Sequence, residues 1–160
     1  MDVFYMNKDL PSGHRALRRG RVTLPNACYL ITTTTWQREP IFADGSLAFS
    51  ACACFENVNI LKDNAMLCWV LTPDHAHWLI QLAENESLSS LVYRMKAASA
   101  RAVNRQRGGS RQVWGKAFHD RQIASERTIR SVARYIVANP LRAGLVGAIG
   151  DYSFWDAVWL

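Results

Sequence analysis

The sequence predicts an α+β fold in which helices pack on an antiparallel sheet. Segments rich in β-branched and aromatic residues alternate with segments whose apolar residues recur at helical spacing. Capping and turn residues separate these segments, and the predicted order of elements is β-α-β-β-α-β-α. The first six elements match the split βαβ arrangement, so we expect a ferredoxin-like sheet with packed helices.

The first half of the chain contains three predicted strands and one helix. Residues 27–36 are β-branched and aromatic, which is typical of a strand. Asp44 can cap a helix. The apolar positions expected on its buried side are Leu47, Ala51, Cys54, Phe55 and Val58. Residues 66–71 form a short apolar run, and 75–82 alternate after a Thr-Pro-Asp turn, so both segments predict strands.

The second half adds two helices and a strand. Ser87 can cap a long helix that Gly108 and Gly109 would end. Residues 117–124 predict the fourth strand. Ser125 can cap the last helix, which Pro140 and Gly144 interrupt.

The length and composition favour one globular domain. With 160 residues, 49% of them apolar, and six tryptophans, we expect a single domain over 27–160 after a basic arm over 1–26. The longest uncharged run carries several threonines and an asparagine, which excludes a membrane span, and the basic N-terminus lacks the apolar core of a signal peptide. We therefore expect a cytoplasmic protein. The four cysteines form no CxxC pair, so buried reduced thiols are expected, with a zinc site as the weaker alternative.

The charge indicates a polyanionic partner. The net charge is +6, and the isoelectric point is near 9.5. Arg94, Arg101 and Arg105 are spaced by seven and four, which places them in one stripe along a helix. The arm carries a second cluster: Arg15, Arg18, Arg19 and Arg21. Both groups are candidates for contacts with a nucleic-acid backbone, although such runs are often only solvated faces.

Two histidines occupy one face of a predicted strand. His75 and His77 are two residues apart, so their side chains leave the sheet on the same side. They are candidate metal ligands, and the alternative is a pair of half-buried polar groups. Two imidazoles leave a metal shell incomplete, which suits a catalytic site better than a structural zinc.

The last helix offers a candidate nucleophile. Tyr135 and Asn139 are four apart and would lie on one helical face, although Pro140 favours extended geometry at Asn139. Taken alone, they could be a packed tyrosine with a wet hydroxyl and a helix terminator. If this helix covers the histidine face, Asn139 could supply a third metal ligand and Tyr135 could attack a phosphate.

Four stretches together resemble a known family. They are WVLTPDHAHWLI at 69–80, WGKAFHDR at 114–121, ARYIVANPLRAGLV at 133–146 and DYSFWDAVWL at 151–160. Over roughly residues 20–160, the chain resembles the REP-associated tyrosine transposases, a branch of the single-tyrosine HUH transposases of insertion sequences.

The resemblance implies a metal-dependent enzyme of DNA transposition and recombination with the HUH endonuclease fold. It implies that His75, His77 and Asn139 hold Mg²⁺ or Mn²⁺ and that Tyr135 is the nucleophile. The substrate would be single-stranded DNA cut beside palindromic repeat hairpins through a 5′-phosphotyrosine, which would make the protein nucleoid-associated. Relatives act as monomers or homodimers, and the sequence does not choose between these. Two alternatives remain: a domesticated protein that binds hairpins without cutting them, and a metal hydrolase that uses water.

Overall fold

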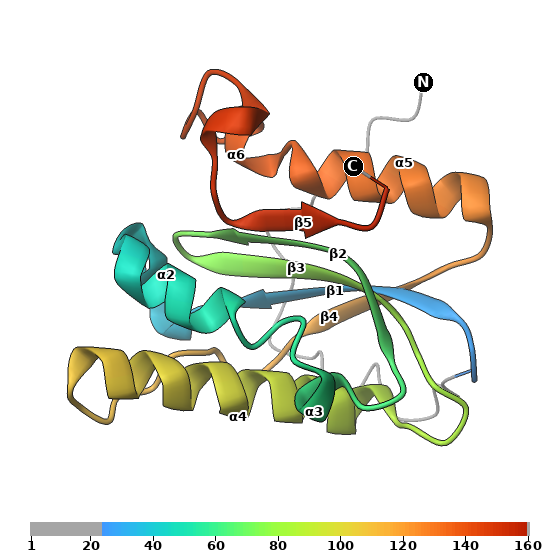
Figure 1. The fold of residues 1–160 in the computed structure, drawn as a ribbon, viewed down its shortest axis with the longest axis horizontal. Coiled ribbons are helices and arrows are strands. Elements are labelled where there is room, and N and C mark those ends of the chain that lie inside the picture. Colours follow the sequence, from blue (N-terminus) through green and yellow to red (C-terminus); the bar gives the residue numbers. More distant parts are fainter. Residues whose placement is uncertain (1–23, 160) are drawn as a thin grey trace.

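A five-stranded antiparallel sheet forms the centre of the protein (Figure 1). The computed structural model describes residues 24–159. The strands are β1 (Cys28–Thr34), β2 (Ala65–Thr72), β3 (His75–Gln81), β4 (His119–Ile123) and β5 (Trp155–Ala157). They lie in the order β4-β1-β3-β2-β5, and each neighbouring pair is antiparallel. The first four strands have the ferredoxin-like order, so the predicted α+β fold is confirmed.

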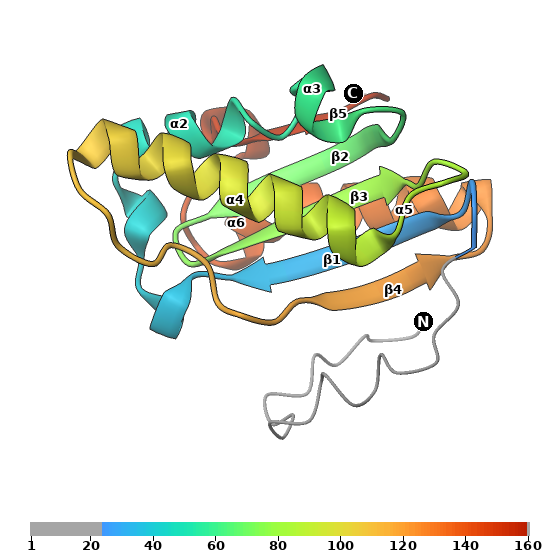
Figure 2. The same ribbon diagram turned by 90° about the horizontal axis from the view of Figure 1, so that it is seen from below.

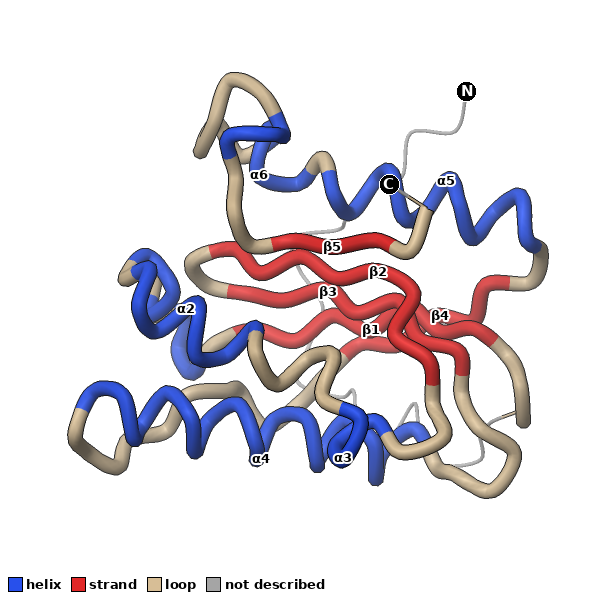
Figure 3. Tube along the Cα trace, in the orientation of Figure 1, coloured by secondary structure: helices blue, strands red, loops and turns tan. Residues whose placement is uncertain are grey.

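Helices cover both faces of this sheet (Figure 2). One face carries α2 (Gly45–Cys52), α3 (Val58–Leu61) and α4 (Leu88–Arg107). The other carries α5 (Glu126–Val137) and α6 (Asn139–Arg142). The tube view shows the strands as one layer between the two helical layers (Figure 3). No helix in the described part of the chain is both long and apolar enough to cross a membrane.

The larger core lies between the sheet and α4. Its centre is an aromatic group in which the Phe55 ring lies 5.2 Å from the Trp78 ring and 5.4 Å from the Trp69 ring. The Trp114 ring makes an edge-to-face contact with Trp78 at 5.9 Å between centroids, and its indole N–H donates to the hydroxyl of the buried Ser99 at 2.9 Å. Tilted and edge-to-face aromatic pairs of this kind add stability beyond the area they bury.

The smaller core lies between the sheet and α5. The helix buries Val132, Ala133, Ile136 and Val137 against strand residues that include Val70 and Leu79. Their spacing follows the turn of the helix, so α5 presents a single apolar stripe to the sheet. This packing fixes which side of α5 faces solvent.

The helix predicted from Asp44 is shorter than expected. Asp44 does cap α2, its Oδ1 accepting from the Ser46 amide at 2.9 Å, but the helix ends at Cys52. The Asn57 side chain accepts from the Asn59 amide and starts a separate turn, which competes with continuation of the helix. The prediction that Val58 is buried is wrong, because its side chain is 74% exposed. Phe55 enters the core from the connecting turn.

Several short elements were not predicted. They are the 3₁₀ turns η1 (Trp36–Arg38), η2 (Ile41–Ala43) and η3 (Ile149–Asp151), together with β5 and α6. The first strand ends at Thr34, two residues early, since Gln37 and Arg38 have φ values of 52° and 56°, which do not fit a strand.

The four cysteines differ in burial, and two of them are buried as expected. All four are free; Cys28 and Cys68 are buried, whereas Cys52 and Cys54 are partly exposed. The pKa of the Cys68 thiol is raised to about 12, mainly by burial. The thiols of the sheet are therefore protonated and unreactive at neutral pH.

We expect Phe55→Ala to lower the free energy of unfolding by about 3–5 kcal/mol, since it leaves a cavity among aromatic rings. Phe49→Ala is the matched control, because Phe49 lies exposed on α2 and should change stability by no more than about 0.5 kcal/mol. Urea denaturation followed by tryptophan fluorescence measures both. Equal effects of the two substitutions would contradict this account of the core.

Candidate active site

The two histidines project from the face of β3 that α5 covers. The next residue of β3 after His77 is Trp78, whose side chain points to the opposite face of the sheet and packs in the larger core. This follows from the alternation of side chains along a strand. His77 is 4% exposed, and His75 is largely buried. Their ring centroids are 5.0 Å apart with the planes nearly perpendicular. The imidazoles therefore form a polar pair on the same face of β3 as the apolar Leu79.

Each imidazole uses its Nδ1 within the fold. His77 Nδ1 lies 2.8 Å from Oγ1 of Thr32, its partner across β1. His75 Nδ1 lies 2.7 Å from Oγ1 of Thr72 and 2.7 Å from a carboxylate oxygen of Asp74. A carboxylate partner favours the proton on Nδ1 and leaves the lone pair on Nε2. Histidine ligands of metals are held by outer hydrogen bonds of this kind.

The protonation state of His77 also suits a ligand. Burial, followed by the charges of His75 and Arg142, lowers the pKa of His77 to about 3. The ring is therefore neutral across the physiological range, as metal coordination requires. This pair could hold a divalent cation through Nε2 atoms.

Tyr135 lies on α5 beside the apolar stripe that packs on the same sheet face. Ile136 and Val137 are buried against the sheet, whereas Tyr135 is 43% exposed. A tyrosine at the edge of such a stripe keeps its hydroxyl accessible while its helix is fixed by packing. The helix that carries Tyr135 therefore packs on the same face of the sheet as the one from which the histidines project.

Asn139 begins the short helix α6 directly after the end of α5, with a kink at Ala138 between the two helices. Ala138 has φ −75° and ψ 0°, and Asn139 is the first residue of α6, with Pro140 next to it. The extended geometry expected before Pro140 is therefore absent. Asn139 is half-buried, and within residues 24–159 no hydrogen bond joins its amide to either imidazole. In that same range no group of three or more His, Cys, Asp or Glu side chains converges to hold a metal.

Arg142 contacts Tyr135, and its charge acts on His77. It was not among the residues predicted from the sequence. Its guanidinium carbon lies 3.8 Å from the centroid of the Tyr135 ring, and its Nη1 donates to the Tyr135 carbonyl at 2.7 Å. Its charge also contributes to the low pKa of His77. A separation of seven residues, about two helical turns, was the pattern that could have indicated it.

The predicted DNA-binding arginines lie away from this site. Arg94 donates to Glu86 at 2.7 Å and to the Ile60 carbonyl at 2.9 Å, so it ties α4 to the preceding loop and to α3. Arg101 and Arg105 are exposed on α4, on the other side of the sheet from Tyr135. The arm arginines Arg15, Arg18, Arg19 and Arg21 lie outside the described residues.

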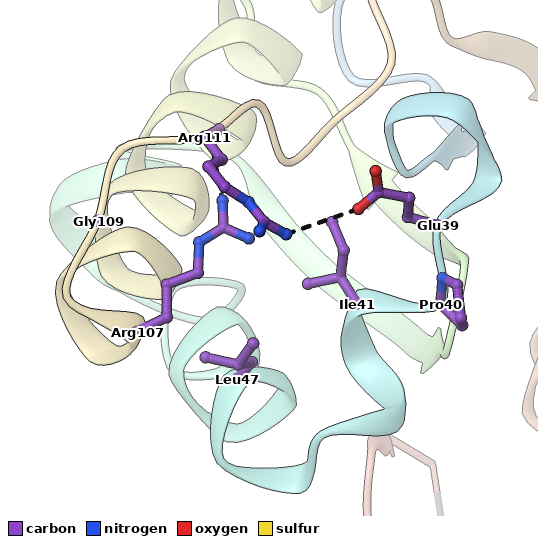
Figure 4. Close-up of a pocket in the computed structure, with 7 residues that line it drawn as sticks. All are labelled: Glu39, Pro40, Ile41, Leu47, Arg107, Gly109 and Arg111. Atoms are coloured by element: carbon purple, nitrogen blue, oxygen red, sulfur yellow. Dashed lines mark hydrogen bonds and ion pairs between the residues drawn. The ribbon is translucent and has the colours of Figure 1, made fainter.

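A cavity of about 380 Å³ also lies on the α4 side (Figure 4). It is lined by Glu39, Pro40, Ile41, Leu47, Arg107, Gly109 and Arg111. Arg111 points across it toward Glu39, with 3.8 Å between their charged atoms. Its lining comes from η2 and the residues before it, from α2, and from the end of α4 with the loop that follows, so it is separate from the histidines and tyrosine.

Comparison with known proteins identifies the class. Residues 23–139 match the model of the IS200-like transposases. This match covers most of the chain, which therefore belongs to the IS200-like transposase family.

Individual relatives include proteins of the REP-associated tyrosine transposase group, to which the sequence resemblance pointed. A Haemophilus influenzae protein named for that group is 27% identical in an alignment of 94 residues, covering 52% of this chain and 53% of the relative. The chain thus spans about half the length of this curated relative.

Two solved structures share the fold. The structure of a REP-associated tyrosine transposase bound to a REP hairpin aligns with a TM-score of 0.65 and 20% identity, covering 84% of this chain and 79% of the other. A Deinococcus radiodurans protein assigned as a transposase aligns with a TM-score of 0.53 and 20% identity, covering 73% and 93% respectively.

We expect Thr32→Val and Asp74→Asn each to weaken Mn²⁺ binding by about 10- to 100-fold, because the first removes and the second weakens a hydrogen bond that orients an imidazole. Titration of free Mn²⁺ by electron paramagnetic resonance measures the dissociation constants. Asp63→Asn is the control, since Asp63 is exposed and lies at the far end of β2, before its first residue. Unchanged affinity in both test variants would mean that the histidine pair is not the metal site.

Proposed function

We propose that this protein is a metal-dependent transposase that cuts and rejoins single-stranded DNA through a 5′-phosphotyrosine at Tyr135. One observation carries the proposal. An accessible tyrosine lies on the helix that packs on the histidine face of the sheet, and Arg142 contacts the tyrosine ring and helps to lower the pKa of His77. The membership in the IS200-like transposase family supports it.

His75, His77 and Asn139 are the residues proposed to hold the cation. The two imidazoles fit this role because their Nδ1 atoms are engaged and their Nε2 atoms remain. Nitrogen ligands favour Mn²⁺, whereas Mg²⁺ prefers oxygen. When bound, such a cation would polarise the phosphate and stabilise the leaving oxygen.

Tyr135 would perform the covalent step. Its phenolic oxygen attacks phosphorus, the bond between phosphorus and the 3′ oxygen breaks, and the leaving 3′ oxygen gains a proton while the phenol loses one. The downstream strand is then joined by its 5′ phosphate to Tyr135. This ester keeps the energy of the phosphodiester for rejoining, which a water nucleophile would discard.

The proposed substrate is DNA with a palindromic hairpin beside the cut. A solved structure of the same fold is described as bound to a REP hairpin, and the net charge of +6 suits a polyanion. The exposed Arg101 and Arg105 are proposed backbone contacts, together with the arm arginines. DNA as a partner would place the protein at the nucleoid. Either a monomer or a homodimer is compatible with a single nucleophile per chain.

We expect Tyr135→Phe to abolish the covalent adduct while hairpin binding persists, because phenylalanine keeps the ring and loses the nucleophilic oxygen. The assay mixes protein and Mn²⁺ with a hairpin oligonucleotide labelled at its 3′ end, the end that a 5′-phosphotyrosine retains. A denaturing gel separates the adduct.

Tyr93→Phe is the matched control, because Tyr93 is an exposed tyrosine on α4, across the sheet from α5. Binding of several repeat hairpins without any adduct in the wild type would mean a non-catalytic hairpin-binding protein. Cleavage that persists in Tyr135→Phe would mean a water nucleophile.

We also expect the Arg101→Gln, Arg105→Gln double variant to reduce the salt dependence of DNA binding. Each lost phosphate contact lowers the slope of log K against log salt by about 0.7–0.9. Fluorescence anisotropy between low and moderate salt measures the slope. An unchanged slope would mean that these arginines face solvent and make no contact with the phosphates.

A further inference from the structure

Tyr135 needs a partner to hold its ring, because α5 alone does not fix it. The backbone is secured by its buried neighbours Ile136 and Val137, but the side chain is 43% exposed. An exposed tyrosine on a helix can leave its rotamer at little cost. A phenol that must attack phosphorus in line, however, has to stay near one orientation.

Arg142 contacts Tyr135 in two ways at once. Its guanidinium lies over the ring face at 3.8 Å, within the range of cation–π attraction. Its Nη1 donates to the carbonyl of the same residue at 2.7 Å. The hydrogen bond holds the guanidinium at the backbone of Tyr135, and the same guanidinium lies over the Tyr135 ring. The position of the ring is therefore tied to the backbone of its own residue.

The kink between α5 and α6 makes this contact possible. The last carbonyls of a helix lack intrahelical backbone donors, and α5 ends at Val137. The Tyr135 carbonyl is one of these, and the Arg142 side chain satisfies it. The Arg142 amide in turn donates to the Ala138 carbonyl at 3.0 Å, which fixes the start of its side chain across the kink.

We propose that Arg142 is a positioning residue for the reaction, holding the Tyr135 ring against the kink so that the phenol faces the histidine pair. This inference rests on the proposed function and adds a residue to it. Arginine suits the role better than lysine, because its planar group can stack on the ring and donate to the carbonyl together.

The test compares Arg142→Ala and Arg142→Lys with Arg134→Ala. Arg134 is an exposed arginine in the last turn of α5. The substitution Arg134→Ala removes the same charge as Arg142→Ala but leaves the Arg142 guanidinium on the Tyr135 ring. We expect Arg142→Ala to slow single-turnover adduct formation by about 100-fold at saturating hairpin DNA. Arg142→Lys should lie between Arg142→Ala and the wild type, and hairpin affinity should remain within about twofold in all three variants.

A second readout follows the ring directly. Tyr135 is replaced by 3-fluorotyrosine in the wild type and in each variant, and the ¹⁹F spectrum is recorded without DNA. In Arg142→Ala the resonance should narrow and move toward that of free 3-fluorotyrosine, whereas Arg134→Ala should leave it unchanged. Loss of rate with an unchanged resonance, or a changed resonance with an unchanged rate, would overturn the positioning role.

The two proposals fail in different ways. A wild type that never forms an adduct would overturn the proposed function and with it the catalytic purpose of Arg142. A wild type that forms the adduct at the same rate as Arg142→Ala would overturn only the inference about Arg142. Circular dichroism of each variant confirms that a lost rate does not reflect unfolding.

Discussion

The hydrogen bond between His77 and Thr32 couples the candidate site to the register of the sheet. His77 is buried, and a buried imidazole without a partner would cost free energy comparable to a lost hydrogen bond. Thr32 provides that partner because β1 and β3 pair with these two residues opposite each other. A slip of one residue would exchange the faces of β3 and bury Trp78 where the histidines now lie.

The alternation of side chains along β3 also gives the two faces of the sheet different packing. On one side, Trp78 and Phe55 build the aromatic core under α4, which supplies most of the buried apolar surface. On the other side, α5 needs only a narrow apolar stripe, and this leaves room for polar groups beside it. The site can therefore carry partly exposed and charged residues because its stability comes from the opposite layer.

Strong periodicity was sufficient to predict the elements that build the site. The alternation of β3 and the apolar spacing of α5 each specify which residues are buried, and both faces were predicted correctly. Tertiary competition explains what was missed: Asn57 begins a new turn and exposes Val58, although spacing alone favoured a longer helix. The three residues of β5 are too few for a periodic pattern, and they pair only because β2 offers an open edge. Arg142 was missed despite its seven-residue spacing from Tyr135, because extended backbone was expected at Asn139 and would have broken that helical spacing.

The placement of charge restricts how a nucleic acid could lie on the protein. Arg101 and Arg105 are on α4, whereas Tyr135 and Arg142 are on the other side of the sheet. Two layer spacings of about 10 Å each separate these surfaces by roughly 20 Å. One phosphate group therefore cannot contact both, and any DNA that reaches both must pass around an edge of the sheet. A hairpin joined to a single strand has two parts that could meet such separate surfaces. Beside the tyrosine, Arg142 contacts the ring and Arg134 is exposed one residue before it, so DNA that reaches Tyr135 meets positive charge without contacting α4.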